Sequence, residues 1–207
     1  MKVGLDLDNV IVDIVASART VIAADIGIDP EHIIDTNIYW DPFTHRDEEI
    51  AQRLKPDHAF WDRQDLLLNA PELPGSLQAA RSLHEAGILT CFITRRPPIV
   101  ELLTARWLHE RNYPQVPVIH VGNTDEVHYF KLCKSSACQT YEVTHMVDDQ
   151  AHEVETLIKA GIKAILVDAP IGQQERQQFI AQHPHVPVVP SVVEAAQMLL
   201  EEYAQMD

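Results

Sequence analysis

The chain has few of the features that mark secreted or membrane proteins. Its 207 residues include only three cysteines, Cys91, Cys133 and Cys138, which are odd in number and lack the paired spacing of a zinc site. Disulfides persist mainly in oxidising compartments, so we expect three reduced thiols in a cytoplasmic protein. No uninterrupted apolar stretch is long enough to span a membrane. The N-terminus runs from one lysine straight into a strand-like segment with acids, which is unlike a signal peptide.

Positive charge is also scarce. The chain has 16 Lys and Arg against 31 Asp and Glu, a formal net charge of −15. Nucleic-acid polymers are bound largely by neutralising their phosphates, so we expect no such partner. A small phosphorylated substrate is compatible with this charge, because a few local cations and a bound metal ion can reverse the potential inside a cleft. The composition leaves open whether the chain forms a homodimer.

Strand-like and helix-like segments alternate over most of the chain. This pattern predicts an α/β fold, a doubly wound, mostly parallel, Rossmann-like sheet with helices on both faces. Residues 14–74 differ, because they show helical signals, no evident strand and a concentration of aromatic residues. We therefore predict a core of residues 1–13 and 75–207, and a small helical cap of residues 14–74 inserted after the first strand. The expected strands are residues 2–7, 88–93, 116–121, 145–147, 163–167 and 186–189. The aromatic residues expected to pack inside the cap are Tyr39, Trp40, Phe43, Phe60 and Trp61.

Two aspartates one residue apart close the first apolar run. Residues two apart on a strand point to the same side, so we expect Asp6 and Asp8 side by side where the strand ends. Adjacent carboxylates repel each other unless a proton or a cation lies between them. Ligands of doubly wound sheets bind at the carboxyl ends of the strands. The segments that follow the other strands are Thr94-Arg95-Arg96, the loop at Gly122, Asp148-Asp149 and Asp168.

The side chains at these strand ends suit a phosphate group and a magnesium ion. Carboxylate oxygens are the hard ligands that Mg²⁺ prefers, and hydroxyl, guanidinium and ammonium groups donate to phosphate oxygens. The predicted metal ligands are Asp6, Asp8, Asp148 and Asp149. The predicted substrate-binding residues are Thr94, Arg95 and Lys134. Asp168 follows a strand too, but we assign it no catalytic role.

The order and spacing of these residues resemble the motifs of the haloacid dehalogenase superfamily of phosphatases, with residues 14–74 as the variable cap. The motifs are Asp6-Leu7-Asp8-Asn9-Val10, Ile93-Thr94, Lys134 and Val147-Asp148-Asp149. Within the superfamily, the Asp-x-Asp-x-Val form, the short cap, Phe60-Trp61 and Leu73-Pro74-Gly75-Ser76 look most like the 5'-nucleotidase, or 5'(3')-deoxyribonucleotidase, branch. Asn9 departs from this branch, where glycine often follows the second aspartate.

The resemblance implies a magnesium-dependent phosphomonoesterase that hydrolyses nucleoside monophosphates. Asp6 would attack phosphorus and form an aspartyl phosphate, a route that is open to a carboxylate held beside a metal. Asp8 would protonate the leaving oxygen and later take a proton from water, while its main-chain carbonyl binds the metal. Thr94 and Lys134 would hold the phosphoryl oxygens and complete the catalytic set.

Several alternatives stay open on the sequence alone. The substrate could be a sugar phosphate or another small metabolite, or a nucleic-acid end, which the acidity disfavours. A non-catalytic phospho-ligand binder is disfavoured because a binder needs no nucleophile. Lys131 competes with Lys134, which we prefer because it opens the helix leading to the Asp148 strand. Arg95 and Arg96 could bind a second phosphate or form salt bridges to the acidic cap.

Overall fold

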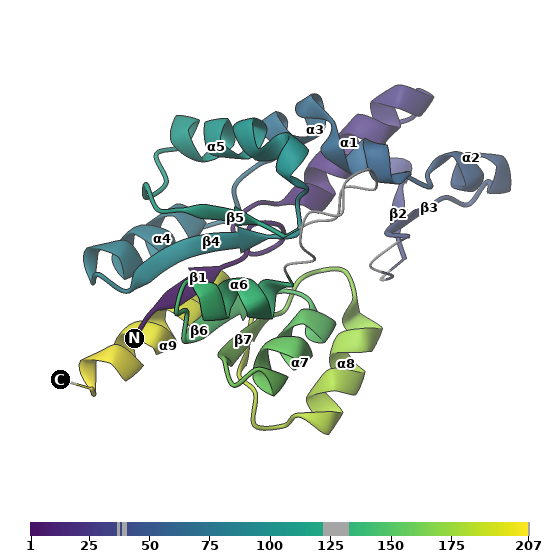
Figure 1. The fold of residues 1–207 in the computed structure, drawn as a ribbon. Coiled ribbons are helices and arrows are strands. Elements are labelled where there is room, and N and C mark those ends of the chain that lie inside the picture. Colours follow the sequence, from purple (N-terminus) through teal and green to yellow (C-terminus); the bar gives the residue numbers. More distant parts are fainter. Residues whose placement is uncertain (37, 39–40, 122–132, 207) are drawn as a thin grey trace.

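A six-stranded parallel sheet forms the centre of the molecule (Figure 1). The computed structural model describes residues 1–36, 38, 41–121 and 133–206. The strand order is β5-β4-β1-β6-β7-β8, and every neighbouring pair is parallel. The predicted doubly wound sheet is confirmed, and each predicted strand is present with its bounds shifted by at most a few residues. The strands are β1 (Val3–Leu5), β4 (Leu89–Thr94), β5 (Val118–His120), β6 (His145–Asp148), β7 (Lys163–Val167) and β8 (Val188–Val189).

The first strand lies in the middle of the sheet, and the chain builds outward from it in two directions. It adds β4 and then β5 on one side, and returns to add β6, β7 and β8 on the other. The order therefore reverses at β1. In sheets of this kind, the crevice at such a reversal, beyond the carboxyl ends of the strands, is the usual ligand site.

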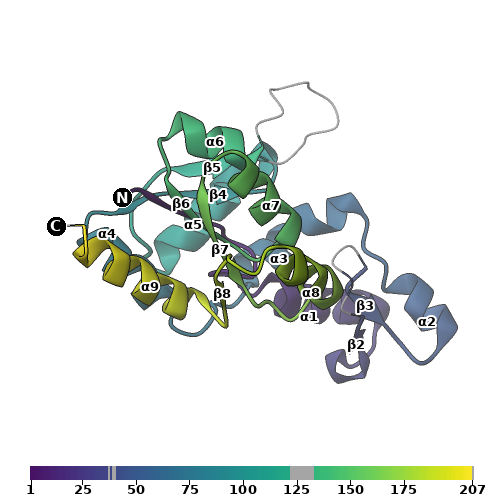
Figure 2. The ribbon, with the colours of Figure 1, turned by 90° about the horizontal axis from the view of Figure 1, so that it is seen from below.

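Apolar side chains on both faces of the sheet are covered by helices (Figures 1 and 2). Successive strand residues point to opposite faces, so Phe92 packs in one apolar cluster, whereas Cys91 and Ile93 pack in the other. The Phe92 cluster is covered by α1 (Ile14–Ile26), α3 (Gln64–Asn69), α4 (Ser76–Glu85), α5 (Glu101–Glu110) and α9 (Val192–Ala204). The Cys91 cluster is covered by α6 (Lys134–Thr140), α7 (Ala151–Lys159) and α8 (Gln173–Gln182).

The predicted cap contains short strands that the sequence did not indicate. β2 (Ile34–Asp35) and β3 (Phe43–Thr44) form an antiparallel pair, so the expectation of an insertion without strands is wrong. Two residues per strand are too few to show an alternating pattern. Together with α2 (Glu48–Arg53), this pair projects away from the sheet in both views (Figures 1 and 2). The remaining short turns are 3₁₀ helices, η1 (Pro30–His32) and η2 (His58–Asp62) in this region and η3 (Pro98–Val100) before α5.

The two ends of this inserted region meet in a short antiparallel stem. The Leu73 N–H donates to the Ile11 carbonyl at 3.0 Å, and the Asp13 N–H donates to the Pro71 carbonyl at 2.9 Å. Val12 and Glu72 form an antiparallel bridge between these bonds. The chain therefore leaves the core and rejoins it at one place. The domain bounds at residues 13/14 and 74/75 stay predictions.

Aromatic packing in the cap follows the expectation where it can be seen. Phe43 and Phe60 are buried, and Trp61 meets the Phe60 ring edge-on with centroids 5.5 Å apart. Tyr39, Trp40 and the Gly122 loop lie outside the described residues.

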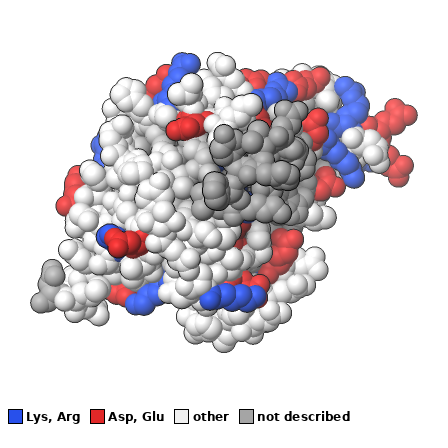
Figure 3. Space-filling model, in the orientation of Figure 1, with Lys and Arg blue, Asp and Glu red and all other residues white. Residues whose placement is uncertain are grey.

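The surface and the thiols agree with the composition. All three cysteines are free, as expected. Among the described helices, none combines the length and the apolar character needed to cross a bilayer. On the face drawn in Figure 3, acidic and basic side chains lie side by side around α2, and the described part of that face shows no continuous basic patch.

Candidate active site

The first strand places Asp6 at the carboxyl edge of the sheet. The Asp6 N–H donates to the Val147 carbonyl at 3.0 Å, which extends the pairing of β1 with β6 by one residue. Asp148 ends β6 on one side of Asp6, and Thr94 ends β4 on the other. Residues that are far apart in the sequence therefore meet at the reversal point because their strands are neighbours.

A buried lysine lies between two of the predicted aspartates. Lys134 is the first residue of α6, and its Nζ lies 2.7 Å from Asp6 Oδ2 and 2.7 Å from Asp148 Oδ2. Its side chain is 0 % exposed. Burial alone would lower the pKa of the ammonium group, but the carboxylates of Asp148 and Asp6 outweigh burial and raise it. Lys134 is therefore a permanent cation at this position. Lys131, the alternative, lies outside the described residues.

The remaining carboxylate oxygens of this group form a candidate magnesium site. Asp6, Asp148 and Asp149 each offer an oxygen within 4.8 Å of the others. Asp6 Oδ1 and Asp149 Oδ1 are buried and have no hydrogen-bond partner among the described residues. Burial raises the pKa of Asp6 well above its usual range, and burial together with the charge of Asp148 raises the pKa of Asp149 to about 7. Buried, unpartnered hard oxygens are what a divalent cation would complete, so these residues fit Mg²⁺.

Asn9 connects the first loop to this carboxylate group. Its backbone is in the left-handed region with φ of 58°, a conformation that asparagine tolerates better than most residues. Its side-chain Nδ2 donates to Asp149 Oδ2 at 3.0 Å. Asparagine therefore keeps the turn without glycine and adds a hydrogen bond that glycine lacks.

Asp8 has a different set of partners. The chain turns directly after β1, where the N–H groups of Ile11 and Val12 both donate to the Leu7 carbonyl at 2.9 Å. The alternation of side chains along the strand thus ends before Asp8. The Asp8 carboxylate instead pairs with Arg96, whose Nη2 donates to Oδ1 at 2.6 Å and whose Nε donates to Oδ2 at 3.0 Å. The Asp8 carboxylate lies outside the group of possible metal ligands found among the described residues, which leaves it free for the proton-transfer role that the resemblance implies. The role of its main-chain carbonyl in metal binding stays a prediction.

Thr94 and the two arginines after it form part of the same edge. Thr94 is fully buried, and its Oγ1 accepts the N–H of Arg96 at 3.2 Å. Arg95 is 43 % exposed and lies 3.1 Å from Glu153 of α7. Both arginines therefore pair with residues outside segment 14–74, so the alternative of salt bridges to the acidic cap is wrong.

Arg96 has a contact that the sequence did not predict, since its role was left open and only Arg95 was placed among the substrate-binding residues. Its side chain is only 4 % exposed and contacts Asp8 directly. The position of Arg96 directly after a strand end could have indicated a role in the site. Arg95 has the same kind of position, so the sequence could not distinguish the two arginines.

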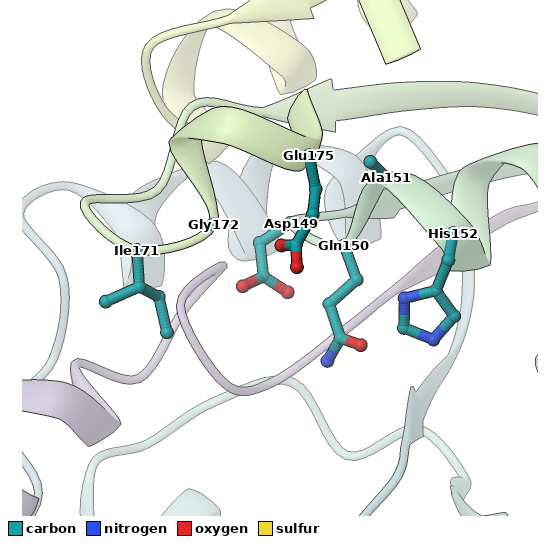
Figure 4. A pocket seen from close by; sticks show the side chains of 7 residues that line it. All are labelled: Asp149, Gln150, Ala151, His152, Ile171, Gly172 and Glu175. Carbon is teal, nitrogen blue, oxygen red and sulfur yellow. The ribbon is translucent and has the colours of Figure 1, made fainter. Parts of the chain in front are cut away.

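A cavity of about 290 Å³ opens beside Asp149 (Figure 4). Glu175 extends into it from α8 toward Asp149 and Gln150, which lie at the start of α7. The other described residues of its lining are Ala151, His152, Ile171 and Gly172. The described lining therefore combines polar and apolar side chains and contains no Phe, Tyr or Trp.

Solved structures with a similar arrangement of elements include a phosphatase, a hydrolase and a putative mutase. A D,D-heptose 1,7-bisphosphate phosphatase from B. bronchiseptica, complexed with magnesium and phosphate, is 17 % identical, with a TM-score of 0.57 over 98 % of this chain and 99 % of that one. A hydrolase of the HAD (haloacid dehalogenase) family from Deinococcus radiodurans, with bound phosphate and sodium, is 17 % identical, with a TM-score of 0.60 over 97 % and 95 %. The chain has the haloacid dehalogenase fold.

A third structure with this fold is a putative beta-phosphoglucomutase from Thermotoga maritima. It is 18 % identical, with a TM-score of 0.59 over 97 % of this chain and 99 % of that one. No family model matches the sequence, and no curated protein matches it significantly. At these identities the likeness establishes the haloacid dehalogenase fold, and the chemistry has to be argued from the chain's own residues.

Proposed function

We propose that this protein is a magnesium-dependent phosphomonoesterase that acts on small phosphorylated metabolites through an aspartyl phosphate. The observation that carries the proposal is the buried group of three carboxylates around Lys134, in which Asp6 keeps one oxygen without a partner. Such an arrangement is unfavourable for stability, because the carboxylates outnumber the ammonium group. It is favourable for holding a phosphoryl group and a cation beside a nucleophile.

Each residue then has a separate task. Asp6 attacks phosphorus, which forms the Asp6–phosphorus bond and breaks the bond to the leaving oxygen. Asp8 gives that oxygen its proton and afterwards takes a proton from the water that hydrolyses the aspartyl phosphate. Lys134 and Thr94 hold phosphoryl oxygens. Most of the rate enhancement would come from positioning and from neutralised charge.

The magnesium ion would be held mainly by Asp6 and Asp149. Each has an oxygen without a partner, whereas both oxygens of Asp148 already accept hydrogen bonds, from Lys134 Nζ at 2.7 Å and from the Gln150 N–H at 3.0 Å. When bound, the ion supplies positive charge beside the transferring phosphoryl group.

Two substrate classes have separate support. The likeness of the motifs to the 5'-nucleotidase branch favours a nucleoside monophosphate. The cavity beside Asp149 favours a sugar phosphate, since its described lining includes carboxylate, amide and imidazole groups that suit hydroxyl groups, and offers no Phe, Tyr or Trp for a base to stack on. Arg95, which is partly exposed beside Thr94, is proposed to contact the substrate in either case.

The test is a substrate screen of the purified protein with p-nitrophenyl phosphate, mononucleotides and sugar phosphates in the presence of Mg²⁺. We expect hydrolysis that EDTA stops and added Mg²⁺ restores. A sugar phosphate well ahead of a flat nucleotide profile would reject the nucleotidase assignment. Phosphate binding without turnover would indicate a phospho-ligand binder, and activity confined to oligonucleotide ends would indicate a nucleic-acid phosphatase.

A further inference from the structure

Arg96 and Asp8 form an ion pair in which the arginine is more deeply buried than the aspartate. The guanidinium meets the carboxylate with two N–H groups, at 2.6 and 3.0 Å, in the bidentate geometry that only arginine provides. The Arg96 side chain is 4 % exposed, whereas that of Asp8 is 22 % exposed. Arg96 therefore supports Asp8 from the protein interior, and the accessible part of the carboxylate faces outward.

Arg96 is itself held at three further points. Its Nη1 donates to Thr104 Oγ1 of α5 at 3.3 Å, and its main-chain N–H donates to Thr94 Oγ1 at 3.2 Å. Its carbonyl lies 3.2 Å from His120 Nδ1 at the end of β5. The orientation of Asp8 is thus determined by β4, β5 and α5 as well as by its own turn.

We propose that Arg96 is a positioning residue that holds the Asp8 carboxylate in the orientation needed for proton transfer to and from the substrate. This inference rests on the proposed phosphomonoesterase function. Arg96 donates hydrogen bonds only and keeps its own protons throughout. The transferred proton passes from Asp8 to the leaving oxygen in the first step, and from water to Asp8 in the second.

Dependence on the leaving group distinguishes this role from a general structural one. Protonation matters most for a poor leaving group, which cannot depart as an anion, and little for a good one. A misplaced Asp8 therefore slows formation of the aspartyl phosphate, the step that kcat/KM reports, much more with phenyl phosphate than with p-nitrophenyl phosphate, although the two substrates have nearly the same shape. Hydrolysis of the aspartyl phosphate is the same step for both substrates and is slowed equally.

The experiment compares wild type, Arg96→Lys and Thr104→Val on these two substrates with Mg²⁺ present. Arg96→Lys keeps the charge and loses the bidentate geometry, so we expect kcat/KM to fall at least about tenfold with phenyl phosphate and less than about threefold with p-nitrophenyl phosphate. Thr104→Val keeps the shape of the side chain and removes the hydroxyl that accepts from Arg96. We expect it to have the same selective effect on phenyl phosphate as Arg96→Lys, but a smaller one. Arg106→Lys is the matched control, because Arg106 is exposed on α5 and pairs only with Glu110 at 2.7 Å within the described contacts.

Equal losses of kcat/KM on the two substrates would overturn the inference and leave Arg96 a structural residue. A rise in KM with unchanged kcat would also overturn it, by making Arg96 a substrate-binding group. If wild type hydrolyses neither substrate, the proposed function fails and the inference fails with it. Active wild type with equal losses in Arg96→Lys rejects the positioning role alone.

Discussion

Two groups of charged side chains lie at the same edge of the sheet, and they differ in whether their charges balance. In the first, Lys134 is the one cation among the described residues that faces the carboxylates of Asp6 and Asp148, with Asp149 close by. In the second, one guanidinium meets one carboxylate, Arg96 on Asp8, with two well-placed hydrogen bonds. The first group has buried oxygens without partners, and for the second no such atom is found among the described residues.

The difference separates two chemical tasks. Burial, together with the charges of the neighbouring carboxylates, raises the pKa of Asp6 and Asp149, and the unpartnered oxygens of the first group could bind a cation. A matched pair needs nothing further and fixes the direction of its carboxylate. The unbalanced group is therefore expected to respond strongly to metal, pH and charge removal, and the balanced pair to respond mainly to changes in geometry.

The largest expected effect is on activity, in Asp6→Asn. An amide cannot replace the attacking carboxylate, so we expect kcat to fall at least about a thousandfold. The fold should survive, because the substitution removes one negative charge from an over-acidic group. Steady-state kinetics and a thermal melt of the metal-free protein check both statements.

Asp168→Asn is the matched control for this substitution. Asp168 also follows a strand, but its side chain is 61 % exposed and its partner is Arg176 Nε at 3.3 Å. It should retain activity. A loss in Asp168→Asn equal to that in Asp6→Asn would remove the distinction between buried and exposed strand-end aspartates.

The next effect is on stability, in Lys134→Met. Removal of the central cation leaves buried carboxylates uncompensated, and we expect the free energy of unfolding to fall by about 3–5 kcal/mol in urea at neutral pH without metal. Lys163→Met is the control, since Lys163 is 69 % exposed in its pair with Glu202 and should cost less than about 1 kcal/mol. Similar losses of unfolding free energy in the two variants would contradict the conclusion that carboxylates outnumber cations in the first group.

The smallest effect is a pH-dependent stabilisation by Mg²⁺. A carboxyl group with a raised pKa in the folded protein binds its proton more tightly there, so its contribution to stability is complete at low pH. That contribution is lost for Asp149 as pH rises from its ordinary pKa of 3.8 through about 7. Mg²⁺ needs the deprotonated carboxylates. Thermal melts should therefore show a rise in Tm of a few degrees with saturating Mg²⁺, and a larger rise at about pH 8 than at about pH 5.5. An equal rise at both pH values would contradict the raised pKa values.

Sequence reasoning reached the first group but not the second. Strand ends are visible as apolar runs that stop at polar residues, and neighbouring parallel strands bring Asp6 and Asp148 together whatever the details of packing. The pairing of Asp8 with Arg96 depends on a turn that removes Asp8 from the strand period and on a side chain 88 positions away. Either of two adjacent arginines could have made this contact, and tertiary contacts such as the hydrogen bond from Arg96 to Thr104 distinguish them.

The same limit applied to the inserted region. Its helices have capping signals and its buried aromatic residues were identified, but strands of two residues leave no periodicity to detect. The conformation of such short elements depends on tertiary contacts. One example is the pair of hydrogen bonds, at 2.5 and 2.6 Å, from Arg19 of α1 to Asp35 of β2.

The stem formed by the bonds from Leu73 to Ile11 and from Asp13 to Pro71 has an evolutionary consequence. A segment whose two ends already touch can be lengthened, shortened or exchanged without any change in the order of the strands that it interrupts. The stem therefore allows the inserted segment to change in evolution independently of the strand-end carboxylates. Lineages could therefore replace the inserted segment while they retain the strand-end residues that are proposed to carry out the reaction.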